Sequence, residues 1–467
     1  MKLHRWNRAK DGLDRLLSSP LFSARQMYQM AVPLVLDGLS VMFINMLITA
    51  LISSSGETSV AAVNLVSPIT TLAICVLNGV CAGGTVTVAQ CFGSGSTEKT
   101  QQAAGHILWL TLLCGSAVAL VMLLLARPML TLLYAGAEKQ VLEKAVTFMA
   151  LSSFSLILYS IYYAVFSILR GLGESKRCLS LSVIINVAYL LFSVLFINLL
   201  HMDIYGSALA LTLARLVGAL TALALVFLPA GLPFRMKLRS VFSFDRAILS
   251  SILEVSIPYG IEQIFLYGGN IVITAIAVPL GTSAIAANSI ANSLFGLITS
   301  TASAAGNLAV TVTGRCIGAG EKKYAYRYGV LMIFFALFLL IASALVFYPL
   351  FPVMLRQLYA ASPALQASVL RLVWHVLPAT LLFWPVSNVV PSVLRTGHDN
   401  VFPSALSLVS MWAVRVAAGY ALAYPLQLGL EGLWIAMWLE WAVRTGILWV
   451  RFRRKKWLEK GAGTAGA

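Results

Sequence analysis

Apolar runs about as long as a bilayer is thick recur along the chain, separated by short stretches rich in Gly, Pro, Ser and charged residues. A helix needs about 20 predominantly apolar residues to cross the hydrocarbon core, so each run predicts a membrane-spanning helix. The pattern predicts twelve spans, near residues 30–52, 60–84, 103–126, 146–169, 178–200, 205–228, 256–279, 284–312, 328–350, 370–392, 402–424 and 430–450. We therefore expect an all-α polytopic membrane protein.

The composition favours a lipid bilayer over a nucleic acid as the partner of this chain. Of its 467 residues, 59% are hydrophobic and 11% are charged. A formal net charge of +16 would also suit a nucleic-acid-binding protein. However, the Lys and Arg residues form short clusters between the apolar runs, as in loops that orient a membrane protein. Nucleic-acid binding is therefore not expected.

The basic clusters also predict the orientation of the chain. Of the 33 Lys and Arg residues, 25 fall on the side of the two termini, five on the opposite side and three within spans. Loops rich in Lys and Arg stay in the cytoplasm. We expect a multi-pass protein of the bacterial inner (plasma) membrane with both termini in the cytoplasm, which an even number of spans requires.

The two halves of the sequence resemble each other. The stretch GETSVAAVNL, which begins at Gly56, returns as GTSAIAANSI from Gly281, an offset of 225 positions. The same offset preserves cysteine, glycine and arginine positions, pairing Cys91 with Cys316, Gly93 with Gly318, Gly95 with Gly320 and Arg170 with Arg395. One register over such a distance indicates duplication of a six-helix unit.

This duplication predicts the domain organisation. Because six spans are an even number, the halves share one orientation, and we expect two six-helix bundles related by a pseudo-twofold axis along the membrane normal. The expected segments are a cytoplasmic N-terminal segment (1–26), a first lobe (27–229), a cytoplasmic linker (230–251), a second lobe (252–452) and a basic cytoplasmic tail (453–467).

Each half places an acid four residues after a proline in its first helix. Pro33 and Asp37 correspond to Pro258 and Glu262. A charged side chain in hydrocarbon costs roughly 2.5–3.5 kcal/mol on insertion scales. The two acids either hydrogen-bond a neighbouring helix, or they bind a proton, a sodium ion or a cationic substrate. On the second interpretation, the predicted cation- or substrate-binding residues are Glu262, Asp37, Tyr259, Gln263, Tyr267 and Asn270.

A second group of charges lies near the end of the chain. Glu440 and Arg444 are four residues apart on the twelfth predicted span, and Arg415 lies at a comparable depth in the eleventh. A desolvated ion pair or triad of this kind holds helices together, so we predict a structural role for Glu440, Arg444 and Arg415. His106 and His375 are interpreted as packing residues.

Motifs for other chemistries are missing from the sequence. The six cysteines have neither metal-site nor disulfide spacing and are interpreted as small buried hydrophobes. The loop GSGSTEKT has Glu98 where a phosphate-binding loop requires its second glycine. We therefore expect no enzyme, no metal and no cofactor other than a coupling ion, H⁺ or Na⁺.

Several motifs resemble the multidrug and toxic compound extrusion (MATE) family of bacteria. They are GETSVAAVNLVSPI, QCFGSGS with its echo GRCIGAGEKK, LRGLGESK, LRTGHDN and the ending GLEGLWIAMWLEWAVRTGILWVRFRRKKW, and the resemblance extends from about Met27 to Trp457. It implies two six-helix bundles around a central cleft that opens alternately to each side. It also implies export of small organic cations and other amphipathic compounds in exchange for H⁺ or Na⁺. We expect the working unit to be a monomer.

The resemblance leaves one alternative and shows two departures. The alternative is a lipid-linked saccharide flippase of the same superfamily, which we expect to line its cleft with several basic residues. The family's acid in the first helix is replaced by Ile48, and the acid that some bacterial members carry in the tenth helix is replaced by Trp384. Glu262 lies about one turn from the family's usual glutamate. Glu262 and Asp37 are the substitutes that this sequence offers.

The predicted orientation can be tested with reporter fusions. A reporter that is active only in the cytoplasm should be active at residue 1, at residue 467 and after Lys99, and inactive after Lys139, because of the charge asymmetry. An externally accessible tag at either terminus would contradict the topology.

Overall fold

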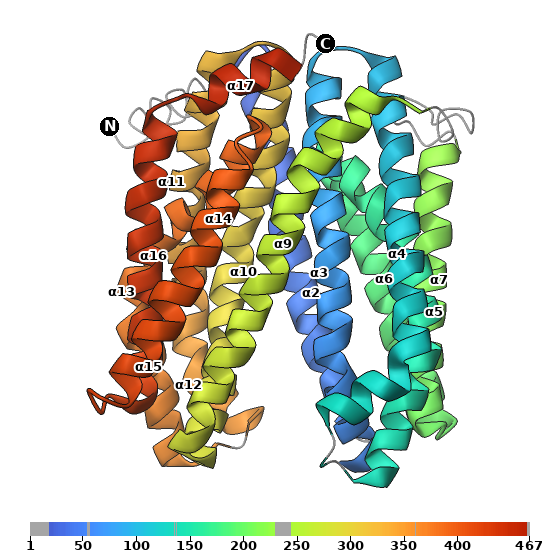
Figure 1. Ribbon diagram of the computed structural model, residues 1–467, viewed down its shortest axis with the longest axis vertical. Coiled ribbons are helices and arrows are strands. Elements are labelled where there is room, and N and C mark those ends of the chain that lie inside the picture. Colours follow the sequence, from blue (N-terminus) through green and yellow to red (C-terminus); the bar gives the residue numbers. More distant parts are fainter. Residues whose placement is uncertain are drawn as a thin grey trace, which may run out of the picture. The chain divides into compact units, whose positions relative to one another are not determined.

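The computed structural model describes residues 18–53, 57–134, 136, 138–228, 244–359 and 361–464. Within these ranges the chain forms helices joined by short turns, and no strand occurs (Figure 1). Twelve helices are long and apolar enough to cross a membrane. The prediction of an all-α protein with twelve spans is therefore confirmed.

Most helices are longer than the predicted spans, since they continue into the polar residues on either side of the apolar stretch. The first six spans are formed by α2 (Ala24–Ser53), α3 (Glu57–Gly93), α4 (Thr97–Leu133), α5 (Lys139–Gly171), α6 (Ser175–Ser193) with the π-helix η1 (Val194–Leu199), and α7 (Asp203–Phe227).

The next six spans follow the same order. They are formed by α9 (Arg246–Ala277) with η2 (Val278–Leu280), α10 (Thr282–Gly318), α11 (Lys322–Phe347) with η3 (Tyr348–Leu350) and α12 (Phe351–Gln357), α13 (Pro363–Thr396), α14 (Val401–Val409) with the π-helix η4 (Ser410–Val416) and α15 (Ala417–Ala423), and α16 (Gly429–Arg453). A short helix, α17 (Trp457–Thr464), follows the last span and was not predicted from the sequence.

Equivalent turns explain why the duplication preserves glycines. Gly95 and Gly320, which are 225 positions apart, both have a φ of 77°, a left-handed conformation that glycine adopts without strain. The turn at Gly95 leads into α4, whose first turn is capped by Ser96, since its hydroxyl accepts a hydrogen bond from the Lys99 N–H at 3.3 Å. The GSGSTEKT stretch is thus a turn and a helix cap.

Contacts divide the chain into two compact units whose boundaries fall inside helices. One, here the C-terminal unit, comprises Met1–Gly38 and Ile264–Ala467, and the other, the central unit, comprises Leu39–Gln263, each taken over its described residues. The boundaries thus lie within α2 and within α9. The first part of α2 therefore belongs to the C-terminal unit and its second part to the central unit, and for α9 the order is reversed.

The same pattern of helix contacts occurs inside each unit. In the central unit α5 contacts α3, α4 and α7, and in the C-terminal unit the equivalent helix α13 contacts α10, α11 and α16. Small residues allow the close approach that helices in lipid require. For example, Ala62 of α3, Ala119 of α4, Ala145 of α5 and Ala208 of α7 belong to one buried cluster.

The beginning of α9 packs on α3 inside the central unit. A Cβ placed on Gly83 would overlap the Ser256 hydroxyl and the Ile252 carbonyl oxygen. Ser256 also donates a hydrogen bond to the Val80 carbonyl at 3.3 Å. Gly83 is therefore a point at which these two backbones approach closely.

This contact predicts opposite effects of one substitution at two glycines. Gly83→Ala should lower the unfolding temperature, because overpacking typically costs about 1–3 kcal/mol. Gly268→Ala should leave it unchanged or raise it, since nothing lies within 4 Å of a Cβ at Gly268 and alanine is the better helix former. Thermal unfolding of both variants in one detergent measures the difference, and equal melting temperatures would contradict the close contact.

Candidate functional site

Both proline-linked acids are buried in helices. Asp37 lies on α2, which contains Pro33, and is 9% exposed. Glu262 lies on α9, which contains Pro258, and is 3% exposed. A proline inside a helix removes one backbone hydrogen bond and leaves a carbonyl free for another partner. The two acids therefore share burial and a position one helical turn after a proline.

The six predicted binding residues are divided between the two units. Tyr259, Glu262 and Gln263 belong to the central unit, whereas Asp37, Tyr267 and Asn270 belong to the C-terminal unit. Of the six, Asn270 lines a cavity that lies wholly inside one unit.

Each acid-bearing segment packs on a helix from the other half of the sequence. A Cβ on Gly38, the residue after Asp37, would lie 3.1 Å from the Ser300 carbonyl oxygen of α10. A Cβ on Gly79 of α3 would lie 2.7 Å from the Cα of Gly260, two residues before Glu262. Since α3 and α10 occupy equivalent positions in the duplication, the two contacts are equivalent and reciprocal.

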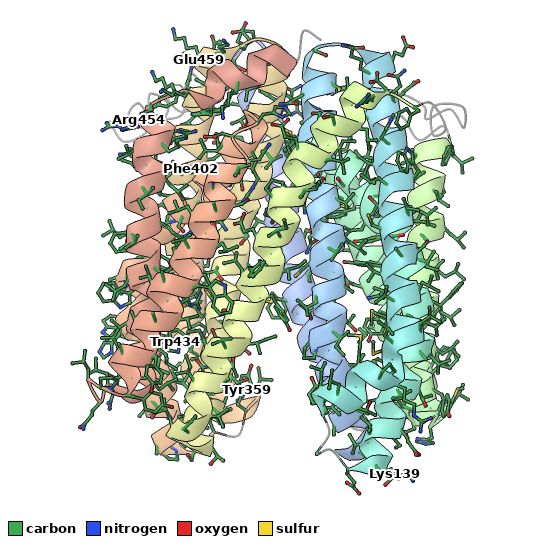
Figure 2. All side chains as sticks on the ribbon, viewed as in Figure 1. Lys139, Tyr359, Phe402, Trp434, Arg454 and Glu459 are labelled. Carbon is green, nitrogen blue, oxygen red and sulfur yellow. The ribbon has the colours of Figure 1, made fainter. Side chains whose placement is uncertain are left out.

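The C-terminal unit contains a polar cavity of about 270 Å³. Helices α9, α10, η4 and α16 line it with amide, hydroxyl, guanidinium and indole groups, provided by Asn270, Thr274, Asn288, Asn292, Arg415 and Trp434. Trp434 lies near the beginning of α16, toward the end of that unit away from Arg454 (Figure 2). Of this set, Asn270 and Arg415 were predicted from the sequence.

Hydrogen bonds fix the amides on one side of this cavity. The Asn292 Nδ2 donates to the backbone carbonyl oxygen of Asn288 at 2.8 Å and to the side-chain Oδ1 of Asn288 at 3.1 Å. The Trp434 indole donates to the same Oδ1 at 3.0 Å. The polar pair at positions 288 and 292 is one helical turn apart in an otherwise small-residue helix, and this spacing was the signal that sequence reasoning missed.

The predicted charged triad is brought together beside the cavity. Glu440 is 1% exposed and accepts a hydrogen bond from Arg444 Nη1 at 3.0 Å, while Arg415 Nη1 lies 3.8 Å from its other carboxylate oxygen. Arg444 also donates to the Ser407 hydroxyl at 2.9 Å. One carboxylate is thus shared by two guanidinium groups, and the triad carries one excess positive charge.

The wide turn of η4 positions Arg415. The π-helix covers Ser410–Val416, the SMWAVR stretch of the sequence. Single π-helical turns occur frequently at functional sites because they displace the side chains that follow. A second π-helix, η1, lies at the end of the fifth span of the first half, so both fifth spans of the duplication carry this irregularity.

The buried arginine of the central unit has different partners. Arg215 of α7 is 7% exposed, donates to the Ser155 hydroxyl at 2.6 Å and lies over the Tyr159 ring at 4.7 Å. Among the residues that the structure describes, no carboxylate lies within ion-pair distance of Arg215. In the C-terminal unit Glu440 therefore compensates the partly buried Arg415 and Arg444. In the central unit a hydroxyl and an aromatic ring contact the buried Arg215.

Of the two histidines interpreted as packing residues, His106 is buried, whereas the His375 side chain is exposed. His106 of α4 is fully buried and accepts a hydrogen bond from the Asp245 N–H at its Nε2, 3.0 Å away. The six cysteines are free thiols, four of them buried and two half-buried. Over the described ranges, no group of three His, Cys, Asp or Glu side chains is arranged to hold a metal ion.

Twelve spans in two equivalent halves, with buried charges inside the helices, define a polytopic transporter built by duplication. The sequence profile of the MatE family matches residues 33–195 and 258–421, segments that begin 225 and end 226 positions apart. These offsets are those of the duplication found in the sequence. The chain belongs to the MatE family, whose members are transporters and not enzymes. The predicted resemblance is therefore confirmed.

Individual relatives are distant in sequence but similar over their full length. An uncharacterized transporter of Bacillus subtilis, YisQ, is 23% identical over 95% of this chain and 97% of its own length. A probable multidrug resistance protein of Thermotoga maritima, NorM, is 22% identical over 94% of each chain. A crystal structure described as MATE in the straight conformation is similar with a TM-score of 0.86, at 21% identity, over 95% of this chain and 98% of that one.

The shared carboxylate predicts a large effect on stability. Glu440→Gln should leave two partly buried guanidinium groups without a counter-charge and should lower the free energy of unfolding by about 3 kcal/mol. Glu431→Gln on the same helix is the matched control, because its 3.5 Å ion pair with Arg371 is exposed on both sides and such pairs contribute less than about 1 kcal/mol. Denaturant unfolding in detergent measures both changes, and equal losses would disprove the role of the triad.

Proposed function

We propose that this protein is a secondary antiporter that exports small amphipathic organic cations in exchange for H⁺ or Na⁺ by alternating access of a central cleft. Membership of the MatE family supports transport, and several relatives are described as multidrug resistance proteins. The observation that carries the proposal is the burial of Glu262 and Asp37, each beside a proline-containing turn of helix.

A buried carboxylate of this kind can couple two fluxes. Its charge is costly in a low dielectric unless a proton, an ion or a cationic substrate neutralises it. Binding one of these cations therefore excludes the others, and exchange at one site is what antiport requires. Any conformational change then follows from the different affinity of each cation for the two states.

The other buried carboxylate of the described spans is less suited to this exchange. Glu440 already accepts hydrogen bonds from Arg444 and from the Ser410 hydroxyl, and Arg415 lies beside it. Because two guanidinium groups already neutralise the Glu440 carboxylate, it needs no further cation to offset its charge. The coupling role is therefore assigned to Glu262 first and to Asp37 second.

The arrangement of the arginines argues against a lipid-linked saccharide flippase. Arg415 and Arg444 share Glu440, so a pyrophosphate would have to compete with that carboxylate for them. Arg215 lies over the Tyr159 ring. A cluster of available cations, which pyrophosphate recognition needs, is thus not supported.

The remaining features of the proposal follow from sequence. The charge asymmetry supports a multi-pass location in the bacterial plasma membrane with both termini cytoplasmic. Similar solved structures are described as MATE in complex with MaL6, MaD3S and Br-NRF. For this chain we propose small organic molecules as substrates and a monomer as the working unit.

Efflux of a fluorescent cation tests the proposal. Cells or vesicles with the wild-type protein should export it in a manner that depends on a proton or sodium gradient, and Glu262→Gln should abolish coupled efflux while leaving the protein in the membrane. Asp37→Asn should reduce efflux less. Glu254→Gln, two turns earlier on α9 with an exposed side chain, is the control and should transport as the wild type does.

Two results would count against the assignment. Wild-type efflux by Glu262→Gln, with unchanged pH and sodium dependence, would exclude this glutamate as the coupling residue. Scrambling of a lipid-linked saccharide by reconstituted wild type, without cation efflux, would favour the flippase.

A further inference from the structure

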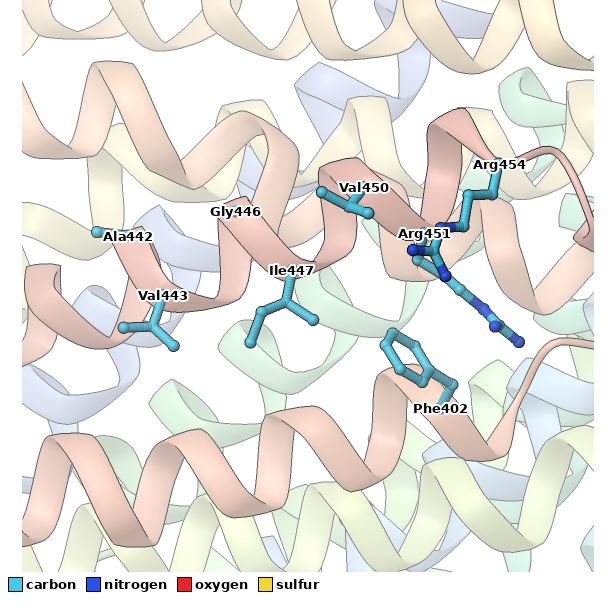
Figure 3. Close-up of a pocket in the computed structure, with 8 residues that line it drawn as sticks. All are labelled: Phe402, Ala442, Val443, Gly446, Ile447, Val450, Arg451 and Arg454. Carbon is cyan, nitrogen blue, oxygen red and sulfur yellow. The ribbon is translucent and has the colours of Figure 1, made fainter.

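An apolar groove of about 580 Å³ runs along the last membrane span of the C-terminal unit. Its floor is one face of α16, formed by Val443, Gly446, Ile447 and Val450, and Phe402 of α14 faces them (Figure 3). Val443, Ile447 and Val450 are each between 42% and 51% exposed. The groove lies outside the polar cavity and the triad described above.

The length of the groove suits one acyl chain. Its apolar floor extends from Ala442 to Val450, eight helical steps or about 12 Å. One leaflet of the hydrocarbon core is about 15 Å thick. A chain lying along α16 therefore spans most of a leaflet and reaches the end of the helix with its headgroup.

Gly446 makes the hollow in this face. Nothing lies within 4 Å of a Cβ placed on Gly446, so no protein contact requires glycine there. In a helix interior glycine costs about 1 kcal/mol relative to alanine. Because glycine has no side chain, it leaves room between the branched apolar side chains of Val443, Ile447 and Val450.

Two arginines close the groove at the end of α16, and one of them is held rigidly. Arg451 donates from Nε and Nη2 to the two carboxylate oxygens of Asp399, at 2.8 and 3.0 Å, and lies over the Phe402 ring at 4.8 Å. This bidentate pair fixes the guanidinium at the mouth of the groove.

The second arginine keeps its charge available. Arg454 is exposed, and in the part of the chain that the structure describes neither a carboxylate nor an aromatic ring takes its charge. By contrast, Arg453 lies over Trp449 at 5.3 Å and Lys455 over Tyr326 at 4.6 Å. Arg454 is thus a cation at the groove that is free to bind an anion.

The surroundings increase this positive potential. Residues 451–456 read RFRRKK. The Nζ of Lys460, on α17, lies 3.6 Å from Oδ1 of Asp399. The acids nearby are Asp399 and Glu459, against six basic residues between positions 451 and 460. Basic clusters immediately after a membrane span attract anionic phospholipids, by about 1 kcal/mol for each Lys or Arg near the surface.

We propose that the α14–α16 groove is a binding site for an anionic phospholipid. One acyl chain lies along Val443, Gly446 and Ile447, and the phosphate group is bound by Arg454 beside the fixed Arg451. The proposal does not depend on what the protein transports.

Lipid binding to the purified full-length protein in a nonionic detergent tests this site. Native mass spectrometry with phosphatidylglycerol, and with phosphatidylcholine of the same acyl chains, gives the two dissociation constants. The wild type should prefer phosphatidylglycerol. Arg454→Gln should weaken phosphatidylglycerol binding about fivefold, as expected for the loss of one surface cation, and should leave phosphatidylcholine binding unchanged.

Two further variants separate the groove from general surface charge. Arg453→Gln removes the same charge one residue away, outside the groove lining, and should bind phosphatidylglycerol as the wild type does. Gly446→Leu puts a side chain into the hollow at a position where a Cβ has no protein atom within 4 Å. It should therefore abolish the preference while keeping the unfolding temperature measured without lipid.

Three outcomes would overturn the proposal. They are equal affinity of the wild type for the two lipids, equal loss of affinity in Arg454→Gln and Arg453→Gln, and a change from dimer to monomer in Gly446→Leu with lipid preference intact. The last result would show that a second copy of the chain occupies the groove.

Discussion

The cost of an uncompensated charge in hydrocarbon governs the arrangement of this protein. A buried carboxylate or guanidinium needs a partner of opposite charge or several hydrogen bonds. In a low dielectric each electrostatic interaction is stronger, and the free-energy cost of leaving a charge without a partner is larger. Glu440 meets this requirement with two arginines and a serine hydroxyl. Arg215 meets it with a hydroxyl and an aromatic ring. Helices α14 to α16, and their irregular π-helical turn, are positioned so that these partners meet.

Close backbone contacts solve the other problem of a helical protein in lipid, the lack of a hydrophobic drive between helices. Glycine and alanine bring the helices together where larger side chains would hold them apart. The same property makes Gly38, Gly79 and Gly83 the points at which the proline–acid segments are attached. Glycine at position 446 has the opposite effect, since nothing lies within 4 Å of a Cβ placed there.

Much of the fold could be predicted from the sequence, because span length and positional repetition are one-dimensional properties. The apolar runs predicted twelve helices, and the recurrence of Gly95 at Gly320 reflected a turn that both halves need. The site could be predicted less well. A duplication states which residues are equivalent but not what they touch, so it could not reveal that the segments of Asp37 and Glu262 pack on α10 and α3. Nor did apolar periodicity reveal Asn288, whose hydrogen bonds to Asn292 and Trp434 exist only in three dimensions.

The distribution of charge also explains how this chain can lack the acids of its relatives' pattern. Trp384 stands where the resemblance places a carboxylate in the tenth helix, and its side chain is 8% exposed. An indole there fills volume and needs no counter-ion. Another buried carboxylate of the second half, Glu440, is held in place by two guanidinium groups. A carboxylate held in this way stabilises helix packing but has little affinity left for a moving cation. Our proposal therefore assigns charge exchange to the other buried acids of the described spans, those that follow Pro33 and Pro258.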